Sequence, residues 1–459
     1  MLAKGHLVPA VELAKLLAAR DEHLSIRVLL YKLHFDADAD SYMQSLLSEN
    51  TRRVQYVQLP DRPPQIPKDA VPNYPMLMGG IIESQKSQVR EVLSELKSRD
   101  SGAPKLAGIV IDMFCTTMID VANEHEVPAY VFYTSTASMI GLRHHVQTVL
   151  DGSDESADLR EFSVSTYVNT VPSKLFPPVW LNKHAPYAHH TRRIISESKG
   201  ILVNTFSELE PYAVAALTNN PTVPTIYPVG PLIDLKAAGK DNPKGDTIMK
   251  WLDTQPPSSV IFLCFGSMGC FDVSQLKEIA HAVENSGFRF LWSMRKPPGK
   301  EQHLAMPSEY DDFGHVLPEG FLERTSGIGR VTGWAPQTQV LGHPAVGGFV
   351  THCGWNSVLE SIWFGVPMAA WPLYAEQQMN AFSLVKEVGV AAEIKIDYMK
   401  DAPVLVGADQ IEGGIREVME GESGIRKKAK ELMEKARNAL VEGGSSYSSL
   451  GRFIEEYSN

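Results

Sequence analysis

The stretch GGFVTHCGWNSVLESIWFGVP, residues 347–367, decides the fold class of the chain. It opens with an apolar run typical of a buried strand, passes through a turn that contains glycine, and continues into a helix that we expect to begin at Asn356 or Ser357. The amino end of a helix presents unpaired backbone N–H groups and a partial positive charge. His352, Asn356 and Ser357 add side-chain donors there, so the segment predicts a strand–turn–helix unit with an anion site suited to a diphosphate.

A purely structural interpretation of this turn stays open. Ser357 and Glu360 have the S-x-x-E spacing of a capping box, in which two side chains pair with the first N–H groups of a helix. A capping box accounts for these two residues but not for His352 or for Trp355.

The alternation of strand and helix continues on both sides of this segment. Short β-rich apolar runs alternate with helical periodicity, which is typical of parallel sheets with helical crossovers, and the pattern occurs twice. The expected strands cover residues 25–32, 53–59, 106–111 and 129–133 in the first half, and 260–265, 288–294, 347–351 and 367–371 in the second. The expected helices cover residues 7–19, 80–99, 117–126, 273–286, 357–363, 380–388 and 425–441, with a short helix after a Gly/Ser break at 443–449.

The sequence therefore predicts an α/β fold with two doubly wound, Rossmann-like parallel-sheet domains that face each other across a cleft. Residues 229–246 are rich in Gly, Pro and Lys and lack periodicity, so we interpret them as a linker. Doubly wound sheets bind ligands beyond the carboxyl ends of their strands, which places the expected site in the cleft. The predicted bounds are 1–228 for the N-terminal domain, 247–440 for the C-terminal domain, and 441–459 for a C-terminal helix that returns to the N-terminal domain.

The composition limits the possible partners. A length of 459 residues suits two domains, and 44% hydrophobic with 21% charged residues is the balance of a water-soluble globular protein. The formal net charge of −11 argues against nucleic acid or an anionic membrane surface as the main partner. The four cysteines show no metal-ligand spacing, so we expect free thiols in a reducing compartment and no metal site. Because neither a signal peptide nor a transmembrane stretch is recognisable, we expect a cytoplasmic protein, and we expect it to act as a monomer.

A longer segment carries a resemblance to a known family. Residues 334–377, WAPQTQVLGHPAVGGFVTHCGWNSVLESIWFGVPMAAWPLYAEQ, resemble at nearly every fixed position the 44-residue signature box of plant secondary-product UDP-glycosyltransferases. The segments GHLVPAVELAKLL, VIDMFC, ILVNTFSELE, YPVGPL, CFGSMG and LPEGF resemble the same family in the same order. The region YKLHFDADADSYMQSL is similar to the branch that glucosylates flavonoids, chalcones and related plant phenolics or terpenoids.

The resemblance implies a GT-B fold, with a UDP-sugar in the C-terminal domain and a small lipophilic hydroxylated acceptor in the N-terminal domain. Two of the donor residues have a structural alternative to ligand binding: Trp334 is also explained by core packing, and Ser267 by an ordinary turn position. Gln377 is the residue type that goes with glucose donors, and Glu376 stands where many members carry Asp. The implied donor contacts are the uracil for Trp334 and Ala335, the ribose for Gln337 and Glu360, the phosphates for Ser267, His352, Asn356 and Ser357, and the sugar for Trp355, Glu376 and Gln377.

The same resemblance implies that His6 is the catalytic base and that Asp112 orients it. The imidazole pKa lies near neutrality, and a carboxylate on the far nitrogen stabilises the imidazolium that forms during transfer. The implied reaction inverts the anomeric centre, forms a β-glucoside, and needs neither a metal nor a cofactor beyond the UDP-sugar co-substrate. Without the resemblance, a surface residue of a first helical turn is the preferred explanation for His6, and a strand-end residue that caps a helix at Thr116 or Thr117 explains Asp112 equally well.

The acceptor pocket is the least defined part of the prediction. We expect it to be lined from the N-terminal domain, although plain core packing explains each side chain as well. The expected lining residues are Met113, Phe114, Tyr133, Met139, Phe176 and Leu181.

Two other enzyme classes lack the motifs that they require. No G-x-G-x-x-G follows a first strand, as a dinucleotide-dependent oxidoreductase requires, and no G-x-S-x-G marks a serine hydrolase.

Family members carry a strand ahead of the G-H motif, whereas Gly5 here lies four residues after Met1. We therefore expect either a trimmed start or a weakened N-terminal domain, and keep as an alternative a UDP-sugar-binding protein that has lost transfer activity.

Overall fold

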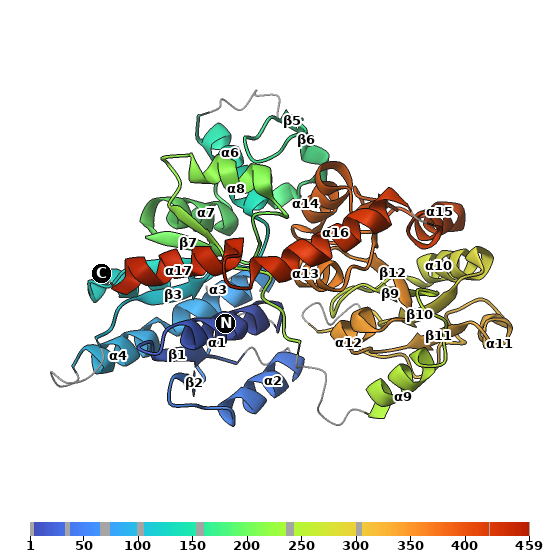
Figure 1. The fold of residues 1–459 in the computed structure, drawn as a ribbon, viewed down its shortest axis with the longest axis horizontal. Helices are drawn as coiled ribbons and strands as arrows, with labels where there is room; N and C mark the ends of the chain where they lie inside the picture. The colour runs from blue at the N-terminus through green and yellow to red at the C-terminus, as the bar shows by residue number, and fades with distance from the viewer. Residues whose placement is uncertain are drawn as a thin grey trace.

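The computed structural model describes residues 4–32, 37–64, 74–98, 105–152, 160–235, 243–299, 305–421 and 423–458. These residues form two α/β halves that lie side by side, the amino-terminal half on the left of Figure 1 and most of the carboxy-terminal half on its right. Parallel strands build the main sheets of both halves, so the predicted α/β fold class is confirmed.

One six-stranded parallel sheet forms the centre of the carboxy-terminal half. In chain order its arrangement is 3-2-1-4-5-6, that of a doubly wound nucleotide-binding sheet, and the order reverses between β9 and β12. Ligands of such sheets bind outside the carboxyl ends of the strands at this reversal. Across the sheet the strands are β11 (Gly329–Thr332), β10 (Arg289–Ser293), β9 (Val260–Cys264), β12 (Val346–Thr351), β13 (Met368–Ala370) and β14 (Ala391–Glu393).

Helices cover both faces of this sheet, and the strand residues alternate between them. Ile261 and Leu263 of β9 pack against α10 and α15, whereas Val260 and Phe262 belong to the core that includes α13 and α16. Burial on both faces explains why β9 is apolar throughout and why β12 has no polar side chain before Thr351. The helices of this half are α9 (Pro243–Leu252), α10 (Val273–Ser286), α11 (Phe321–Arg324), α12 (Gln337–Gly342), α13 (Trp355–Phe364), α14 (Gln377–Phe382), α15 (Ala408–Met419) and α16 (Gly424–Ala439), with a π-helix over Ser383–Val388.

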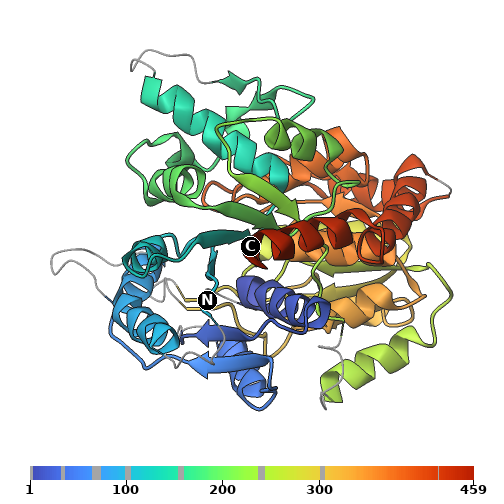
Figure 2. The same ribbon diagram turned by 60° about the vertical axis from the view of Figure 1, so that its left-hand side comes forward.

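The strands of the amino-terminal half belong to separate sheets. A parallel pair, β1 (Ile26–Leu30) and β2 (Val54–Gln58), lies below the four-stranded sheet in Figures 1 and 2. The four-stranded parallel sheet has the order β3 (Ile109–Asp112), β4 (Ala129–Tyr133), β7 (Gly200–Val203) and β8 (Thr225–Pro228). A short antiparallel pair, β5 (Glu161–Phe162) and β6 (Val171–Pro172), lies at the far end of this half.

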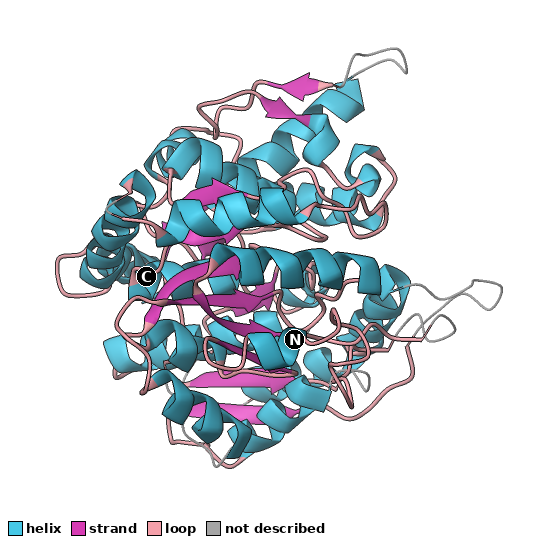
Figure 3. Ribbon diagram, turned by 90° about the vertical axis from the view of Figure 1, so that its right-hand side faces the viewer, coloured by secondary structure: helices cyan, strands magenta, loops and turns pink. Residues whose placement is uncertain are grey.

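Helices surround these strands, as the secondary-structure colouring of Figure 3 shows. None of the described helices combines the length and the apolarity that crossing a membrane requires. The helices are α1 (Lys4–Arg20), α2 (Ala37–Leu47), α3 (Tyr74–Ser84), α4 (Lys86–Lys97), α5 (Met118–Glu124), α6 (Ala137–Gly152), α7 (Pro186–Glu197) and α8 (Pro211–Thr218), with 3₁₀ turns at Ser173–Leu175 and Pro178–Leu181.

The last helix, α17 (Ser445–Ser458), runs from the carboxy-terminal half back across the amino-terminal half (Figure 1). It packs against β8 and α1. Phe453 is 2% exposed and meets Tyr130 and Tyr227 edge-on, with ring centroids 5.0 and 5.4 Å away. Ser446 Oγ donates a hydrogen bond of 2.6 Å to the carbonyl of Gly230. The helix α17 thereby contributes to the hydrophobic core of the amino-terminal half.

Several expected boundaries differ from the structure. The single helix expected over 80–99 is two helices, α3 and α4, which meet at Gln85, and residue 99 lies outside the described residues. The helix expected to start at Asn380 begins three residues earlier and continues as a π-helix. The Gly/Ser segment expected to separate two helices lies largely in α17, because Ser445 already begins that helix. Of the predicted linker, residues 236–242 lie outside the described chain and α9 begins at Pro243.

The packing of α17 leads to a stability prediction. Phe453→Ala leaves a cavity between two buried tyrosine rings, so the free energy of unfolding of the amino-terminal half should fall by about 3–5 kcal/mol. Urea unfolding followed by intrinsic fluorescence measures the change. Tyr212→Ala, which truncates an aromatic residue that is 52% exposed, is the control and should change stability little. Equal stabilities of the two variants would contradict a structural role for α17.

Candidate active site

His6 and Asp112 meet although 106 residues separate them in the chain. His6 lies in the first turn of α1, and Asp112 is the last residue of β3, so a helix start and a strand end bring the pair together. His6 Nδ1 lies 2.7 Å from Asp112 Oδ2. The side chain of Asp112 is 1% exposed and that of His6 is 23% exposed, so the carboxylate is buried while the imidazole reaches the surface.

Two further contacts orient this pair. The backbone N–H of Phe114 donates to Asp112 Oδ1 at 2.9 Å, and Thr134 Oγ1 lies 2.9 Å from His6 Nδ1. Hydrogen-bond partners decide the tautomer of a histidine, and both oxygens facing Nδ1 favour a proton on that nitrogen. We therefore assign the lone pair to Nε2, which is the arrangement that a general base needs.

The electrostatics of the pair favour opposite charges. Burial acts to lower the pKa of His6, but the charge of Asp112, its hydrogen bond and the charge of Glu376 outweigh burial and raise that pKa above 6.5. Burial likewise acts to raise the pKa of Asp112, and the charge and hydrogen bond of His6 with the N–H of Phe114 lower it below its ordinary value. The site therefore holds a carboxylate that stabilises a proton gained by His6.

The predicted anion site lies at the carboxyl end of β12. Cys353 has a φ of 61°, which is uncommon for a residue with a side chain, and it turns the chain from β12 into α13. The helix begins at Trp355 with Gly354 as its N-cap, and no side chain caps it. The first N–H groups of α13 are therefore free to bind an anion at the positive end of the helix.

The capping box considered for Ser357 and Glu360 does not form. Because α13 begins earlier than expected, Ser357 lies inside its first turn. Ser357 Oγ accepts a hydrogen bond of 2.9 Å from Gln337 Nε2, and the same nitrogen donates to Glu360 Oε2 at 2.8 Å. The structure thus brings Gln337 and Glu360, which are expected to bind the ribose, together with Ser357, which is expected to bind a phosphate. Burial raises the pKa of Glu360 to about 7, although Gln337 and Thr338 oppose the rise through hydrogen bonds.

His352 is held between two glycine backbones. A Cβ atom added at Gly266 would lie 2.6 Å from His352 Nε2, and one added at Gly354 would lie 2.5 Å from it. Both distances are too short, so neither position can carry a side chain. His352 is 6% exposed, and burial lowers its pKa to about 4, so it is neutral at pH 7. Its Nδ1 has no hydrogen-bond partner among the described residues. A neutral imidazole at this place can donate one N–H to an oxyanion beside α13.

The remaining predicted donor residues surround this turn. Ser267 is exposed in the turn that follows β9, the strand beside β12. Trp334 is half-buried and Ala335 is buried, in the segment between β11 and α12. Glu376 is the N-cap residue of α14 and Gln377 begins that helix. Gln377 Oε1 accepts the backbone N–H groups of residues 373 and 374 at 2.9 and 3.1 Å, which leaves its amide N–H groups as donors.

Hydrogen bonds join the two halves at this site. Asn356 Nδ2 donates to the carbonyl of Gly5 at 2.7 Å, next to His6. Trp355 is 4% exposed, and its indole N–H donates to the carbonyl of Asn204 at 2.7 Å. The start of α13 therefore contacts the amino-terminal half directly beside His6.

The residues expected to line an acceptor pocket divide into two groups. Met113 and Phe114 follow β3 beside the His6–Asp112 pair, and the ring of Phe114 lies 5.3 Å from that of His6. Tyr133 is buried at the end of β4, and burial raises its pKa above the ordinary value. Farther along the chain, Met139 and Phe176 are 2% and 3% exposed in the hydrophobic core, and Leu181 is half-buried against it. Their contact with an acceptor stays a prediction.

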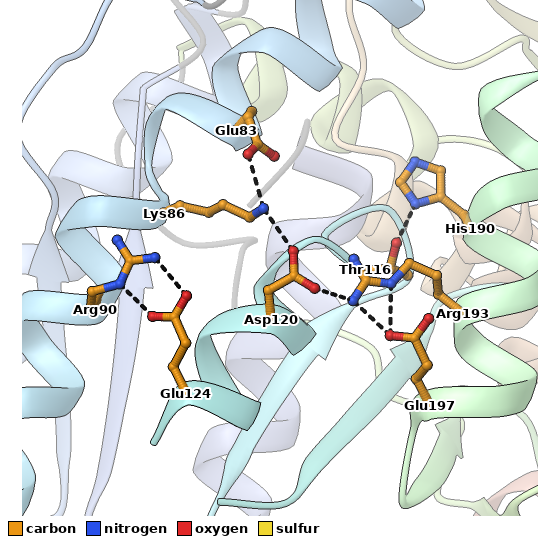
Figure 4. A network of polar contacts seen from close by, with 9 residues as sticks. All are labelled: Glu83, Lys86, Arg90, Thr116, Asp120, Glu124, His190, Arg193 and Glu197. Carbon is orange, nitrogen blue, oxygen red and sulfur yellow. Dashed lines mark hydrogen bonds and ion pairs between the residues drawn. The ribbon is translucent and has the colours of Figure 1, made fainter. Parts of the chain in front are cut away.

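Sequence reasoning missed two polar residues near His6. Thr134 directly follows β4, and its place at the carboxyl end of a strand beside β3 was the available signal. His190 of α7 lies with Nδ1 2.6 Å from Thr116 Oγ1 (Figure 4). Its ring meets that of Phe114 edge-on, with the ring centroids 6.2 Å apart. Burial lowers the pKa of His190 to about 4, so it is a neutral polar group at pH 7, next to Phe114 and close to the His6–Asp112 pair.

Comparison with known proteins agrees with this geometry. Residues 214–456 match the family described as UDP-glucoronosyl and UDP-glucosyl transferase. Over 98% of its length the chain is 49% identical to UDP-glucose flavonoid 3-O-glucosyltransferase 6 of Fragaria ananassa, of which it covers 96%. The chain belongs to the family of UDP-glucuronosyl and UDP-glucosyl transferases.

Further relatives of this UDP-glycosyltransferase support the assignment. It is 48% identical to Anthocyanidin 3-O-glucosyltransferase 1 of Manihot esculenta over 98% of its own length and 99% of that relative. The solved structure of Medicago truncatula UGT71G1 complexed with UDP-glucose matches with a TM-score of 0.85 and 41% identity, covering 100% of this chain and 97% of that one. The resemblance based on the signature box and the GT-B fold class are therefore confirmed, and the chain is a UDP-dependent glycosyltransferase.

The His6–Asp112 contact of this transferase leads to a titration prediction. Asp112→Asn removes the negative charge that raises the pKa of His6, while burial still lowers it, so the pKa of His6 should fall. NMR titration of the imidazole resonances, assigned by comparison with His6→Ala, measures the shift. Asp409→Asn, which changes an exposed carboxylate on α15, is the control and should leave that pKa unchanged. An unaltered pKa of His6 in Asp112→Asn would rule out the coupling.

Proposed function

We propose that this enzyme transfers glucose from UDP-glucose to a hydroxyl group of a small phenolic acceptor of the flavonoid type, with inversion at the anomeric carbon. The relatives that act on flavonoids and anthocyanidins support the acceptor class, and the solved neighbour with UDP-glucose supports the donor. The proposed base is His6, positioned by Asp112, and the proposed donor site is the start of α13 with the residues around it.

One observation carries the proposal. Asn356 in the first turn of α13 hydrogen-bonds the carbonyl of Gly5, the residue before His6. A diphosphate bound at the amino end of α13 therefore lies beside the imidazole that accepts the acceptor proton. This closeness supports transfer over the alternative of a protein that only binds a UDP-sugar.

In the proposed mechanism the acceptor hydroxyl gives its proton to His6 Nε2. The acceptor oxygen forms a bond to the anomeric carbon while the bond from that carbon to the diphosphate oxygen breaks on the opposite face, which inverts the configuration. Asp112 stabilises the imidazolium, and the departing UDP carries away the negative charge. The N–H groups of α13 with the side chains of His352 and Ser357 stabilise that charge.

Donor selection follows from the side chains around α13 and α14. Gln337 and Glu360 already lie together, so their polar groups can share the ribose hydroxyls. The amide N–H groups of Gln377 and the carboxylate of Glu376 provide a donor and an acceptor for the hydroxyls of glucose. The half-buried indole of Trp334 offers a face for uracil, and such stacking contributes about 1–3 kcal/mol per base.

Three further parts of the proposal concern the metal requirement, the oligomeric state and the cellular location of the enzyme. Because a helix end and neutral donors can balance the diphosphate charge, we propose transfer without a metal ion or other cofactor. Both members of the proposed catalytic pair come from one chain, so the pair needs no residue of a second copy, and we propose that the enzyme acts as a monomer. The four buried free cysteines fit a reducing compartment, and we propose the cytoplasm.

The role of His6 is tested by His6→Ala. Loss of a general base should reduce transfer to a phenol about 10²–10⁴-fold, while UDP binding persists because the donor residues are untouched. Product formation by mass spectrometry and UDP binding by calorimetry measure the two effects. His315→Ala is the control, because that side chain is 83% exposed in another part of the protein. Transfer near the wild-type rate in His6→Ala would exclude His6 as the base.

The donor site is tested by Glu360→Ala. Hydrogen bonds to the ribose are equal in the ground and transition states, so their loss should raise KM for UDP-glucose about 10–100-fold and change kcat little. Steady-state kinetics with varied UDP-glucose separate the two constants. Glu417→Ala, which removes an exposed carboxylate of α15, should leave KM unchanged. A fall in kcat at constant KM would place Glu360 elsewhere in the mechanism.

A further inference from the structure

One short segment of the amino-terminal half holds two imidazoles. Residues 112–116 run from the last residue of β3 toward α5. At the start of this segment Asp112 Oδ2 lies 2.7 Å from His6 Nδ1, and at its end Thr116 Oγ1 lies 2.6 Å from His190 Nδ1. Because Nδ1 and Nε2 point in different directions from an imidazole ring, both rings turn Nε2 away from these contacts.

The ring of Phe114, midway along this segment, contacts both imidazoles. Its centroid lies 5.3 Å from that of His6 and 6.2 Å from that of His190. The two imidazoles are therefore no farther apart than the sum of these distances. An apolar surface with a few well-placed polar groups is the usual composition of a small-molecule site.

Ion pairs hold His190 in place through the helix α7. Arg193 lies one turn later on the same face of α7, and it donates to Asp120 of α5 at 2.5 Å and to Glu197 at 2.7 Å (Figure 4). Lys86 of α4 donates to the same Asp120 carboxylate at 2.8 Å. The pairs with Asp120 link α7 to its neighbours, so the position of the His190 ring does not depend on a ligand.

The contact with Thr116 decides which nitrogen of His190 carries the proton. Thr116 is fully buried, and among the residues that the structure describes its hydroxyl has no hydrogen-bond partner other than His190 Nδ1. A proton on Nδ1 would leave this buried hydroxyl without an acceptor for its own proton, which is unfavourable. We therefore assign the hydroxyl as the donor, Nδ1 as the acceptor, and the ring proton to Nε2.

The Nε2–H group of His190 is available to a ligand. Within the described part of the chain no atom hydrogen-bonds this nitrogen, and the half-buried ring leaves it accessible to solvent. Burial lowers the pKa of His190 to about 4, although the charge of Asp112 opposes the fall, so the ring keeps a single proton at pH 7. His190 thus presents a neutral donor at Nε2, whereas His6 presents a lone pair at the same atom.

These two nitrogens fit two different oxygens of one ligand. His6 Nε2 accepts the proton of the hydroxyl that reacts. The donor on His190 is best matched by an oxygen that only accepts, such as a ketone carbonyl, because a second hydroxyl would bring a proton that needs a partner of its own. The arrangement around Phe114 lets the two oxygens lie on different rings of a flavonoid.

We propose that His190 determines acceptor specificity by donating its Nε2–H to a carbonyl oxygen of the phenolic acceptor while His6 takes the proton of the reacting hydroxyl. Ketone-bearing acceptors, such as flavanones, flavones and chalcones, are then preferred over carbonyl-free phenols of the same shape. The inference rests on the proposed function, since it concerns the acceptor of the same transfer.

Two acceptors that differ only in the carbonyl test this preference. The first is the flavanone with a single hydroxyl at the para position of its phenyl ring, and the second is the flavan in which a methylene replaces the ketone. The ketone is not conjugated with this phenol, so the two hydroxyls have nearly the same acidity. We expect the wild-type enzyme to prefer the flavanone about 5–10-fold in kcat/KM, mainly through KM, because one neutral hydrogen bond is made in the ground and transition states alike.

Three variants separate ligand binding from a structural role. His190→Asn keeps an acceptor for the Thr116 hydroxyl but has no group at the place of Nε2, so it should lose the preference through a loss with the flavanone alone. His190→Gln returns an N–H to that place and should regain most of the preference. His281→Asn, which changes an exposed histidine of α10 in the other half, is the control and should keep the wild-type preference. The circular dichroism spectrum and Tm verify that each variant is folded.

NMR tests the contact without relying on turnover. With UDP bound, the flavanone should shift the nitrogen and proton resonances of His190 Nε2, and the flavan should shift them much less. Equal rates of the wild-type enzyme with both acceptors, a preference that survives in His190→Asn, or an equal loss with both acceptors in that variant would overturn the inference and leave the proposed function standing. Transfer by the wild-type enzyme to neither acceptor would instead contradict the proposed phenolic acceptor, and this inference with it.

Discussion

The hydrogen bond between His6 and Asp112 depends on the meeting of a helix start and a strand end. The first turn of α1 must lie over the carboxyl end of β3, and the N–H of Phe114 must hold the second oxygen of the carboxylate. Thr134, at the end of the neighbouring strand, then holds Nδ1 from another side. Parallel strands place all their carboxyl ends at one edge, and this common edge allows distant segments to build one site.

The charges of the site are distributed unevenly between its two sides. On the side of His6, a buried carboxylate prepares the imidazole to take up a proton. On the side of α13, burial lowers the pKa of His352 to about 4, so that its imidazole is neutral at pH 7, and raises the pKa of Glu360 to about 7, so that its carboxyl group is only partly ionised there. This reduced negative charge would weaken the repulsion of a dianionic diphosphate, which the start of α13 attracts in the proposed function. The proposed acid–base chemistry and the proposed anion binding thus belong to different halves.

Local signals allowed much of this to be predicted, and tertiary contacts account for the rest. The strand–turn–helix around His352 was readable because its residues are contiguous, and the doubly wound sheet follows from repeated strand–helix alternation. The capping box was wrong because α13 begins at Trp355, which places Ser357 inside the helix, where Gln337, 20 residues away, hydrogen-bonds it. The contact of Asn356 with Gly5 spans 351 residues, and no periodicity or spacing reveals such a bond. The roles of His6 and Asp112 came from the family resemblance, and their contact only from the fold.

The course of α17 has a consequence for biosynthesis. Phe453 belongs to the core of the amino-terminal half, yet it is translated after the whole carboxy-terminal half. Domains generally fold as units from the amino terminus during synthesis, but here Phe453 cannot cover Tyr130 and Tyr227 until the carboxy-terminal half has been translated. The nascent amino-terminal half therefore exposes an apolar surface throughout translation of the other half.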